Sequence, residues 1–159
     1  MASRRVAAAG CLCLLAGLPA TAEDLGFDVV VGLTPKAAET LSKTGEGVVV
    51  SAWYYADPKA GAEAEANPVG LIDVGAEELD LGPLGGPVRI TGSGVRNEAF
   101  AWIGGPVYVN VNVWSARRSG PDNILDCDFF DGLLTRATAA PVELRCGLFE
   151  EDIPVQAKS

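Results

Sequence analysis

The sequence predicts a mainly β protein, an antiparallel β-sandwich of about seven strands with two short helices and one disulfide. Several short segments alternate apolar with other residues, which is the pattern of strands that have one face on a core. Gly and Pro, with 19 and 10 of the 159 residues, separate these segments as turn residues do. Many strands divided by such turns, with little helix between them, favour a sandwich.

The chain is expected to begin its fold with a strand and a helix. Alternating apolar residues predict the strand over residues 27–33. The helix is predicted over residues 35–43, since Thr34 can cap its N-terminus and Pro35 fits its first turn. Gly45 suits the end of this helix, because glycine accepts the left-handed backbone that is common there.

Further strands are expected to follow the first helix. They are predicted over residues 47–56, 69–74, 78–81, 87–91 and 106–115. The first of them is apolar on both faces, which is typical of a central or covered strand. After it, residues 57–68 alternate Ala with Glu between two X-Pro pairs, so we expect a mobile surface loop.

A second helix and a last strand complete the prediction. The helix is expected over residues 127–138, where Leu125, Phe129 and Leu133 recur at every fourth position, although Gly132 interrupts the pattern. The last strand is expected over residues 142–148.

Residues 1–22 have the layout of an export signal. Arg4 and Arg5 precede an uncharged apolar run over residues 6–20, which is shorter than the about 20 residues that span a bilayer. The small residues of Ala20-Thr21-Ala22 favour cleavage before Glu23, which leaves a single domain over residues 23–159. We therefore expect a periplasmic or secreted protein that is not inserted in the membrane after cleavage. A lipoprotein signal ending at Cys11 is the alternative, but its apolar core would be very short.

The net charge of the chain restricts the classes of molecule that are expected to bind it. Once Arg4 and Arg5 are removed, 10 basic residues face 21 acidic ones, which gives a net charge of −11. A field of this sign repels nucleic acids and anionic lipid surfaces, so no nucleic acid is expected as a partner.

Cysteine usage agrees with export. Cys11 and Cys13 belong to the signal, so only Cys127 and Cys146 stay in the mature chain. An even pair in an oxidising compartment predicts a structural disulfide. A redox-active pair is the alternative, but the close Cys-x-x-Cys spacing is missing.

The absence of histidine excludes several chemistries. Neither a Ser-His-Asp nor a Cys-His catalytic site can be built. Zinc and copper sites lack their usual ligands, so no metal and no cofactor are expected. Gly92-Ser93-Gly94 follows a predicted strand, but no helix start comes after it, and we interpret it as a turn rather than a phosphate-binding loop.

Four aspartates form the densest group of carboxylates, namely Asp122, Asp126, Asp128 and Asp131. Carboxylates of this density are typical of calcium sites, but Phe130 stands where an EF-hand loop needs an oxygen ligand. The alternative is that Asp122 caps a turn or helix and the others lie on its solvated side.

The strand over residues 106–115 carries the candidate binding residues. Its valines alternate with aromatic and amide side chains, and two arginines follow: Tyr108, Asn110, Asn112, Trp114, Arg117 and Arg118. Aromatic rings, amides and arginine are the groups that dominate protein and sugar recognition. The alternative is that the second helix or the 57–68 loop covers this face.

Three segments resemble other proteins. Residues 33–38 (LTPKAA), 45–52 (GEGVVVSA) and 119–127 (SGPDNILDC) are similar to segments of small exported bacterial proteins of unassigned function. The resemblance implies export and carries no catalytic residues.

These observations predict a non-catalytic exported binding or accessory module, whose partner is an unknown protein or glycan. Two alternatives stay open. One is a carboxylate-based hydrolase of envelope glycans, which would use a carboxylate pair such as Asp126 and Asp128. The other is an inhibitor of an extracytoplasmic enzyme, which would present residues 57–68.

Overall fold

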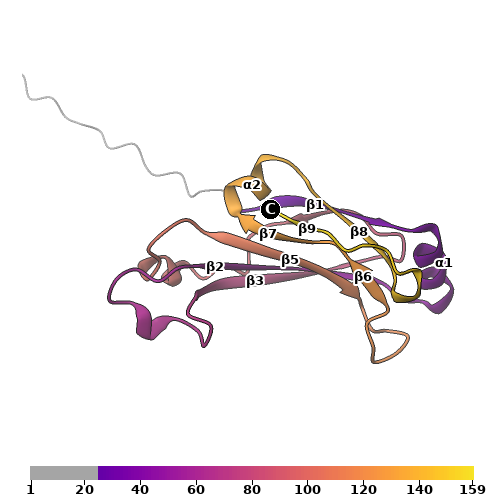
Figure 1. Cartoon of the computed structure of the whole chain (residues 1–159), viewed down its shortest axis with the longest axis horizontal. Helices are drawn as coiled ribbons and strands as arrows, with labels where there is room; N and C mark the ends of the chain where they lie inside the picture. Colours follow the sequence, from indigo (N-terminus) through magenta and orange to yellow (C-terminus); the bar gives the residue numbers. More distant parts are fainter. Residues whose placement is uncertain (1–24) are drawn as a thin grey trace, which may run out of the picture.

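The computed structural model describes residues 25–159, in which two β-sheets pack face to face (Figure 1). The signal peptide that we expect over residues 1–22 lies outside the described residues. Within residues 25–159 there are nine strands, two more than expected. The strands are β1 (Phe27–Leu33), β2 (Val48–Ala56), β3 (Ile72–Leu81), β4 (Gly86–Ile90), β5 (Tyr108–Ser115), β6 (Leu125–Cys127), β7 (Phe129–Leu133), β8 (Val142–Leu148) and β9 (Ala157–Lys158).

The mainly β fold is confirmed, and its two sheets are mixed rather than wholly antiparallel. The four-stranded sheet has the order β4-β1-β8-β6 and the five-stranded sheet the order β3-β2-β5-β7-β9. The pairs β1–β8 and β7–β9 are parallel, and the other pairs are antiparallel. The inner faces meet in one apolar core. Across it, the ring of Phe27 on β1 meets that of Tyr54 on β2 edge-on, with centroids 6.2 Å apart.

The first helix, α1 (Pro35–Thr44), is confirmed together with its caps. The hydroxyl of Thr34 accepts a hydrogen bond of 3.1 Å from the backbone N–H of Ala37. Gly45 ends the helix in the left-handed conformation, with φ of 68°. Ala37 and Leu41 bury one side of α1 against the end of the four-stranded sheet. Figure 1 shows this helix at one end of the sandwich.

Residues 72–81 form one strand where we expected two, over residues 69–74 and 78–81. β3 runs through Gly75, whose φ of 137° lets the strand bulge opposite Tyr54 and Tyr55. A side chain at Gly75 would overlap the carbonyl oxygen of Gly94, and one at Gly94 would overlap that of Ala76. Two glycines therefore allow the turn over residues 92–94 to lie directly against β3. The other predicted strands agree with the structure to within two residues.

The prediction of the second helix is wrong over residues 127–133. Residues 125–133 form β6 and β7, and α2 is confined to Leu134–Ala139. The aromatic residue Phe130 is buried in the core as a strand residue opposite Val111. Asp128, between the two strands, is fixed by backbone N–H groups of distant segments. Tertiary contacts thus override a helical pattern that Gly132 already weakened.

Cys127 and Cys146 form the predicted disulfide. Their sulfur atoms are 2.05 Å apart, and the two residues lie directly opposite each other on β6 and β8. The bond therefore joins two neighbouring strands rather than a strand and a helix. Within the described part of the chain, no helix is long and apolar enough to cross a membrane.

Candidate binding face on the five-stranded sheet

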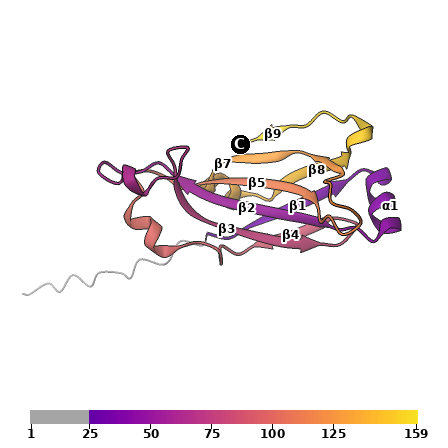
Figure 2. The same ribbon diagram turned by 90° about the horizontal axis from the view of Figure 1, so that it is seen from below.

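The four strand residues of the candidate site share the outer face of the five-stranded sheet. Along β5 their neighbours Val109, Val111 and Val113 point into the core. Figure 2 looks onto the outer face, and no helix of the described chain lies over it. Asn112 is exposed, and Tyr108, Asn110 and Trp114 are half-buried.

The expected cover of this face is absent from the described structure. α2 packs at an end of the sandwich against β1, β5 and β7. The segment over residues 57–71 lies beyond the ends of the strands (Figure 2). It is fixed there, because Lys59 N–H donates to the carbonyl of Trp102 and Gly104 N–H to that of Asp57, each at 2.8 Å. The predicted loop therefore contains an anchored 3₁₀ turn, Glu63–Glu65.

β2 adds two aromatic residues to the face that the sequence analysis missed. Tyr55 lies opposite Tyr108, and Trp53 lies opposite Asn110. The rings of Trp53 and Tyr55 stack with centroids 4.7 Å apart, and those of Tyr55 and Tyr108 with centroids 5.5 Å apart. The alternation of β2 places Trp53 and Tyr55 on one face, but both faces of this strand are apolar, so the pattern does not indicate which face is outward.

Two carboxylates hold the polar ends of these rings. The indole N–H of Trp53 donates to Asp73 Oδ1 at 3.0 Å, and the hydroxyl of Tyr55 donates to Asp131 Oδ1 at 2.5 Å. Burial raises the pKa of Tyr55 to about 12, with a further contribution from the bond to Asp131. Tyr55 therefore stays protonated at neutral pH and acts as a donor, not as a base.

The amides of the face form a pair. Asn112 Nδ2 donates a hydrogen bond to Asn110 Oδ1. This bond leaves the Nδ2 donors of Asn110 and the Oδ1 acceptor of Asn112 for other partners. Trp114, farther along β5, lies opposite Val49 of β2. Asn112 lies opposite Ser51 of β2, and Asn110 lies between Trp53 of β2 and Asp131 of β7.

The two arginines lie in the segment after β5 and away from the stacked rings. Arg118 Nη2 pairs with Asp80 Oδ1 on β3 at 3.0 Å. Arg117 is exposed and has a positive φ of 56°. The structure therefore brings together the four residues on β5 and places Arg117 and Arg118 beyond the strand end.

Glu46 is a buried carboxylate that no sequence pattern indicated. It is 2% exposed, and its oxygens accept hydrogen bonds from Gly47 N–H, Arg118 N–H, Ser119 N–H and the Ser119 hydroxyl. Burial raises the pKa of Glu46, but these four donors outweigh it and lower the pKa to about 2. Glu46 thus fastens the segment after β5 to the start of β2.

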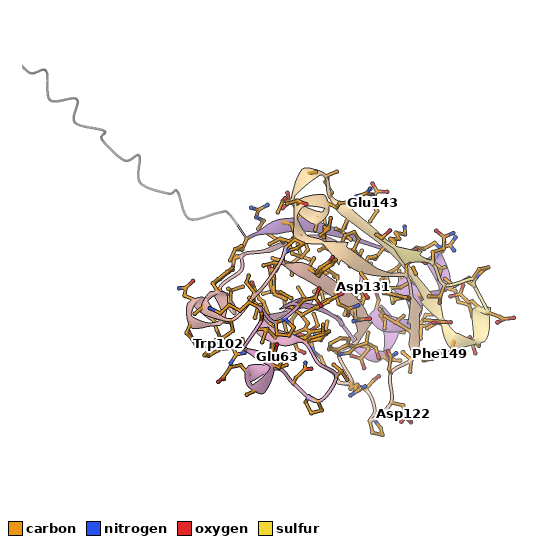
Figure 3. All side chains as sticks on the ribbon, turned by 60° about the vertical axis from the view of Figure 1, so that its left-hand side comes forward. Glu63, Trp102, Asp122, Asp131, Glu143 and Phe149 are labelled. Carbon is orange, nitrogen blue, oxygen red and sulfur yellow. A yellow bond between two sulfur atoms is a disulfide. The ribbon has the colours of Figure 1, made fainter. Side chains whose placement is uncertain are left out.

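The four clustered aspartates are dispersed in the structure. Figure 3 shows Asp122 at the tip of a loop and Asp131 on the sheet, well apart. Asp128 is 3% exposed and accepts hydrogen bonds from Arg145 N–H and Gln156 N–H, so its expected place on a solvated face is wrong. Burial raises its pKa, but these bonds and Lys158 lower it overall. Within residues 25–159, no group of three or more His, Cys, Asp or Glu side chains is arranged to hold a metal ion.

Comparison of the chain with protein-family models, with curated proteins and with solved structures finds no match. The resemblance to small exported bacterial proteins therefore stays a prediction.

Proposed function

We propose that the chain is an exported, non-catalytic binding module whose ligand surface is the outer face of the five-stranded sheet. One observation carries the proposal: the stacked rings of Trp53, Tyr55 and Tyr108 lie beside an amide pair on a sheet face without a covering helix. Tyr and Trp combine a large apolar area with a polar group, and they are enriched where proteins bind ligands.

The chemistry of the face supports binding rather than catalysis. Asp73 and Asp131 lie on strands three steps apart in the sheet, so their backbones are separated by roughly 14 Å. Each carboxylate instead accepts a hydrogen bond from a ring of the face, Asp73 from Trp53 and Asp131 from Tyr55. Asp128, which the hydrolase alternative would use, has both oxygens occupied by backbone donors.

Export is part of the proposal. It is supported by the charge pattern of residues 1–22 and by a disulfide, which persists in oxidising compartments. We expect the mature protein in the periplasm or the medium, beginning at Glu23. Mass spectrometry of the full chain after expression in a bacterial host tests this, and an intact N-terminus in the cytoplasmic fraction would contradict it.

The binding function is tested with one substitution on the face and one away from it. Tyr108→Ala removes the last ring of the stack, and Phe149→Ala removes an aromatic ring that is 55% exposed elsewhere (Figure 3). Immobilised wild-type and variant proteins are exposed to exported proteins and to neutral oligosaccharides. We expect retention by the wild type and by Phe149→Ala, and a loss of about tenfold in Tyr108→Ala. Equal retention by all three proteins would refute the proposed surface.

A further inference from the structure

The stacked rings lie among carboxylates that outnumber the nearby cations. Along β3, Asp73 pairs with Arg96 at 3.3 Å, and Asp80 pairs with Arg118. Three other carboxylates on or beside the face form no ion pair within residues 25–159, namely Asp57, Glu78 and Asp131. The binding face therefore has an excess of negative charge.

Asp131 contacts the stacked rings and forms no ion pair with another described residue. Its Oδ1 accepts the hydrogen bond from Tyr55, and within the described residues its Oδ2 has no partner. Tyr108 ends the ring stack, so one side of its ring faces no other ring of the stack. The Oδ2 of Asp131 and the Tyr108 ring thus lie on neighbouring strands, β7 and β5, with Asp131 opposite Asn110 and Leu133 opposite Tyr108.

We propose that this face binds a basic, extended peptide segment of a partner protein, with an arginine side chain seated between Asp131 and Tyr108. This inference rests on the proposed binding function and names the chemistry of its ligand. A guanidinium group is planar, stacks on aromatic rings and donates parallel hydrogen bonds to a carboxylate. The amide pair on β5 offers donors and acceptors to the backbone of such a peptide.

Charge complementarity favours a basic peptide over a neutral glycan. A neutral ligand would cover Asp131 and Glu78 without supplying a cation, and removing an unpaired carboxylate from water is unfavourable. A basic peptide supplies the missing charge and is attracted before contact. Moreover, the rings of Trp53 and Tyr55 stack on each other, which leaves less ring face for a sugar.

The test is a titration of the mature, disulfide-bonded protein with defined probes. The probes are a short arginine-rich peptide, the same peptide with lysine or with glutamate in place of arginine, and a neutral hexasaccharide. Tryptophan fluorescence is the readout, since Trp53 belongs to the stack. Each titration is run at low salt and at about 150 mM salt, where surface charges are more strongly screened.

Two variants locate the binding. Asp131→Asn removes the proposed carboxylate, and Glu143→Gln removes an exposed carboxylate from β8, on the other sheet (Figure 3). We expect the arginine peptide to bind more tightly than the lysine peptide and the glutamate peptide not to bind. Asp131→Asn should weaken the arginine peptide about tenfold, while Glu143→Gln leaves its affinity within about twofold.

The other outcomes overturn the inference in different ways. If both variants weakened the binding of the arginine peptide equally, the peptide would be attracted by the overall negative charge and not bound at a defined site. Binding of the hexasaccharide that is lost in Tyr108→Ala but kept in Asp131→Asn would replace the peptide with a glycan and leave the proposed binding function standing. Failure of every probe, together with unchanged retention of exported components by Tyr108→Ala, would reject both.

Discussion

Within residues 25–159, three buried carboxylates accept hydrogen bonds mainly from backbone N–H groups. Glu46 binds the segment after β5, and Asp128 binds β8 and the C-terminal segment. Glu77 accepts hydrogen bonds from Thr91, Gly92 and Ser93. The backbone N–H groups of residues 91–93 thus bind a carboxylate, and this carboxylate belongs to the Glu77 side chain of the protein itself. Each carboxylate thus fixes a loop to a sheet.

Replacing Glu46 by Gln is expected to destabilise the fold. Glutamine keeps one acceptor oxygen and turns its NH₂ group toward N–H donors, so at least one backbone donor loses its partner. We expect a loss of roughly 2–3 kcal/mol at pH 7 in urea denaturation. The exposed Glu143→Gln variant should lie within about 0.5 kcal/mol of the wild type.

The same carboxylate makes stability depend on pH. Its pKa is about 2 in the folded protein, against 4.5 for an unperturbed glutamate. Its contribution is therefore complete above pH 4.5 and is lost as the pH falls from 4.5 toward 2. In Glu46→Gln this part of the acid dependence should disappear. The difference in unfolding free energy between wild type and variant should be smaller at about pH 3 than at about pH 7. The same difference at both pH values would contradict the role assigned to Glu46.

Gly94 is required because of its contact with β3. A methyl group at Gly94 would overlap the carbonyl oxygen of Ala76, whereas nothing lies within 4 Å of one at Gly105. We expect Gly94→Ala to lose about 2 kcal/mol or more of unfolding free energy and Gly105→Ala to lose little. Thermal denaturation of the two variants measures the difference, and similar melting temperatures would show that the turn can move away from β3.

Among the elements, β6 and β7 show where a sequence pattern misleads. Leu125, Phe129 and Leu133 follow a helical spacing, but the chain places only Leu125 fully in the core. The deciding contacts come from β5, β8 and the C-terminal segment, which are distant in sequence. By contrast α1 was predictable, because its caps are local.

The binding face was predictable on β5 and missed on β2. Alternation of valine with polar residues separates the two faces of β5, but β2 carries Trp and Tyr outward and equally apolar residues inward. Which side faced the core could not be decided from that strand alone. The pairing of Tyr55 with Tyr108 depends on strand register, which no local pattern specifies.

The disulfide holds β6, the short edge strand of the four-stranded sheet, in place. β6 has three residues, and Cys127 holds it against β8 across a sequence separation of 19 residues. Replacing both Cys127 and Cys146 by Ala should reduce the unfolding free energy by about 3 kcal/mol, measured in urea without reductant. Adding reductant to the wild type should reproduce this loss. A variant as stable as the oxidised wild type would contradict it.

For the whole molecule, the fold class followed from strand periodicity and turn residues, while the sheet order did not. β1 and β8 run in the same direction, and the strands β2 to β7 lie between them in the sequence. Such a pairing depends on the path of the entire chain between them. Amino-acid composition and local sequence patterns therefore do not predict the pairing of β1 with β8.

The parallel pairing of β1 with β8 also has a consequence for the timing of folding. β1 is formed by residues 27–33, and its parallel neighbour β8 by residues 142–148. During synthesis, β1 therefore lacks that neighbour until residues 142–148 have been made. Contacts so distant in sequence form slowly. The four-stranded sheet is therefore completed late, because β8 lies between β1 and β6 in its strand order.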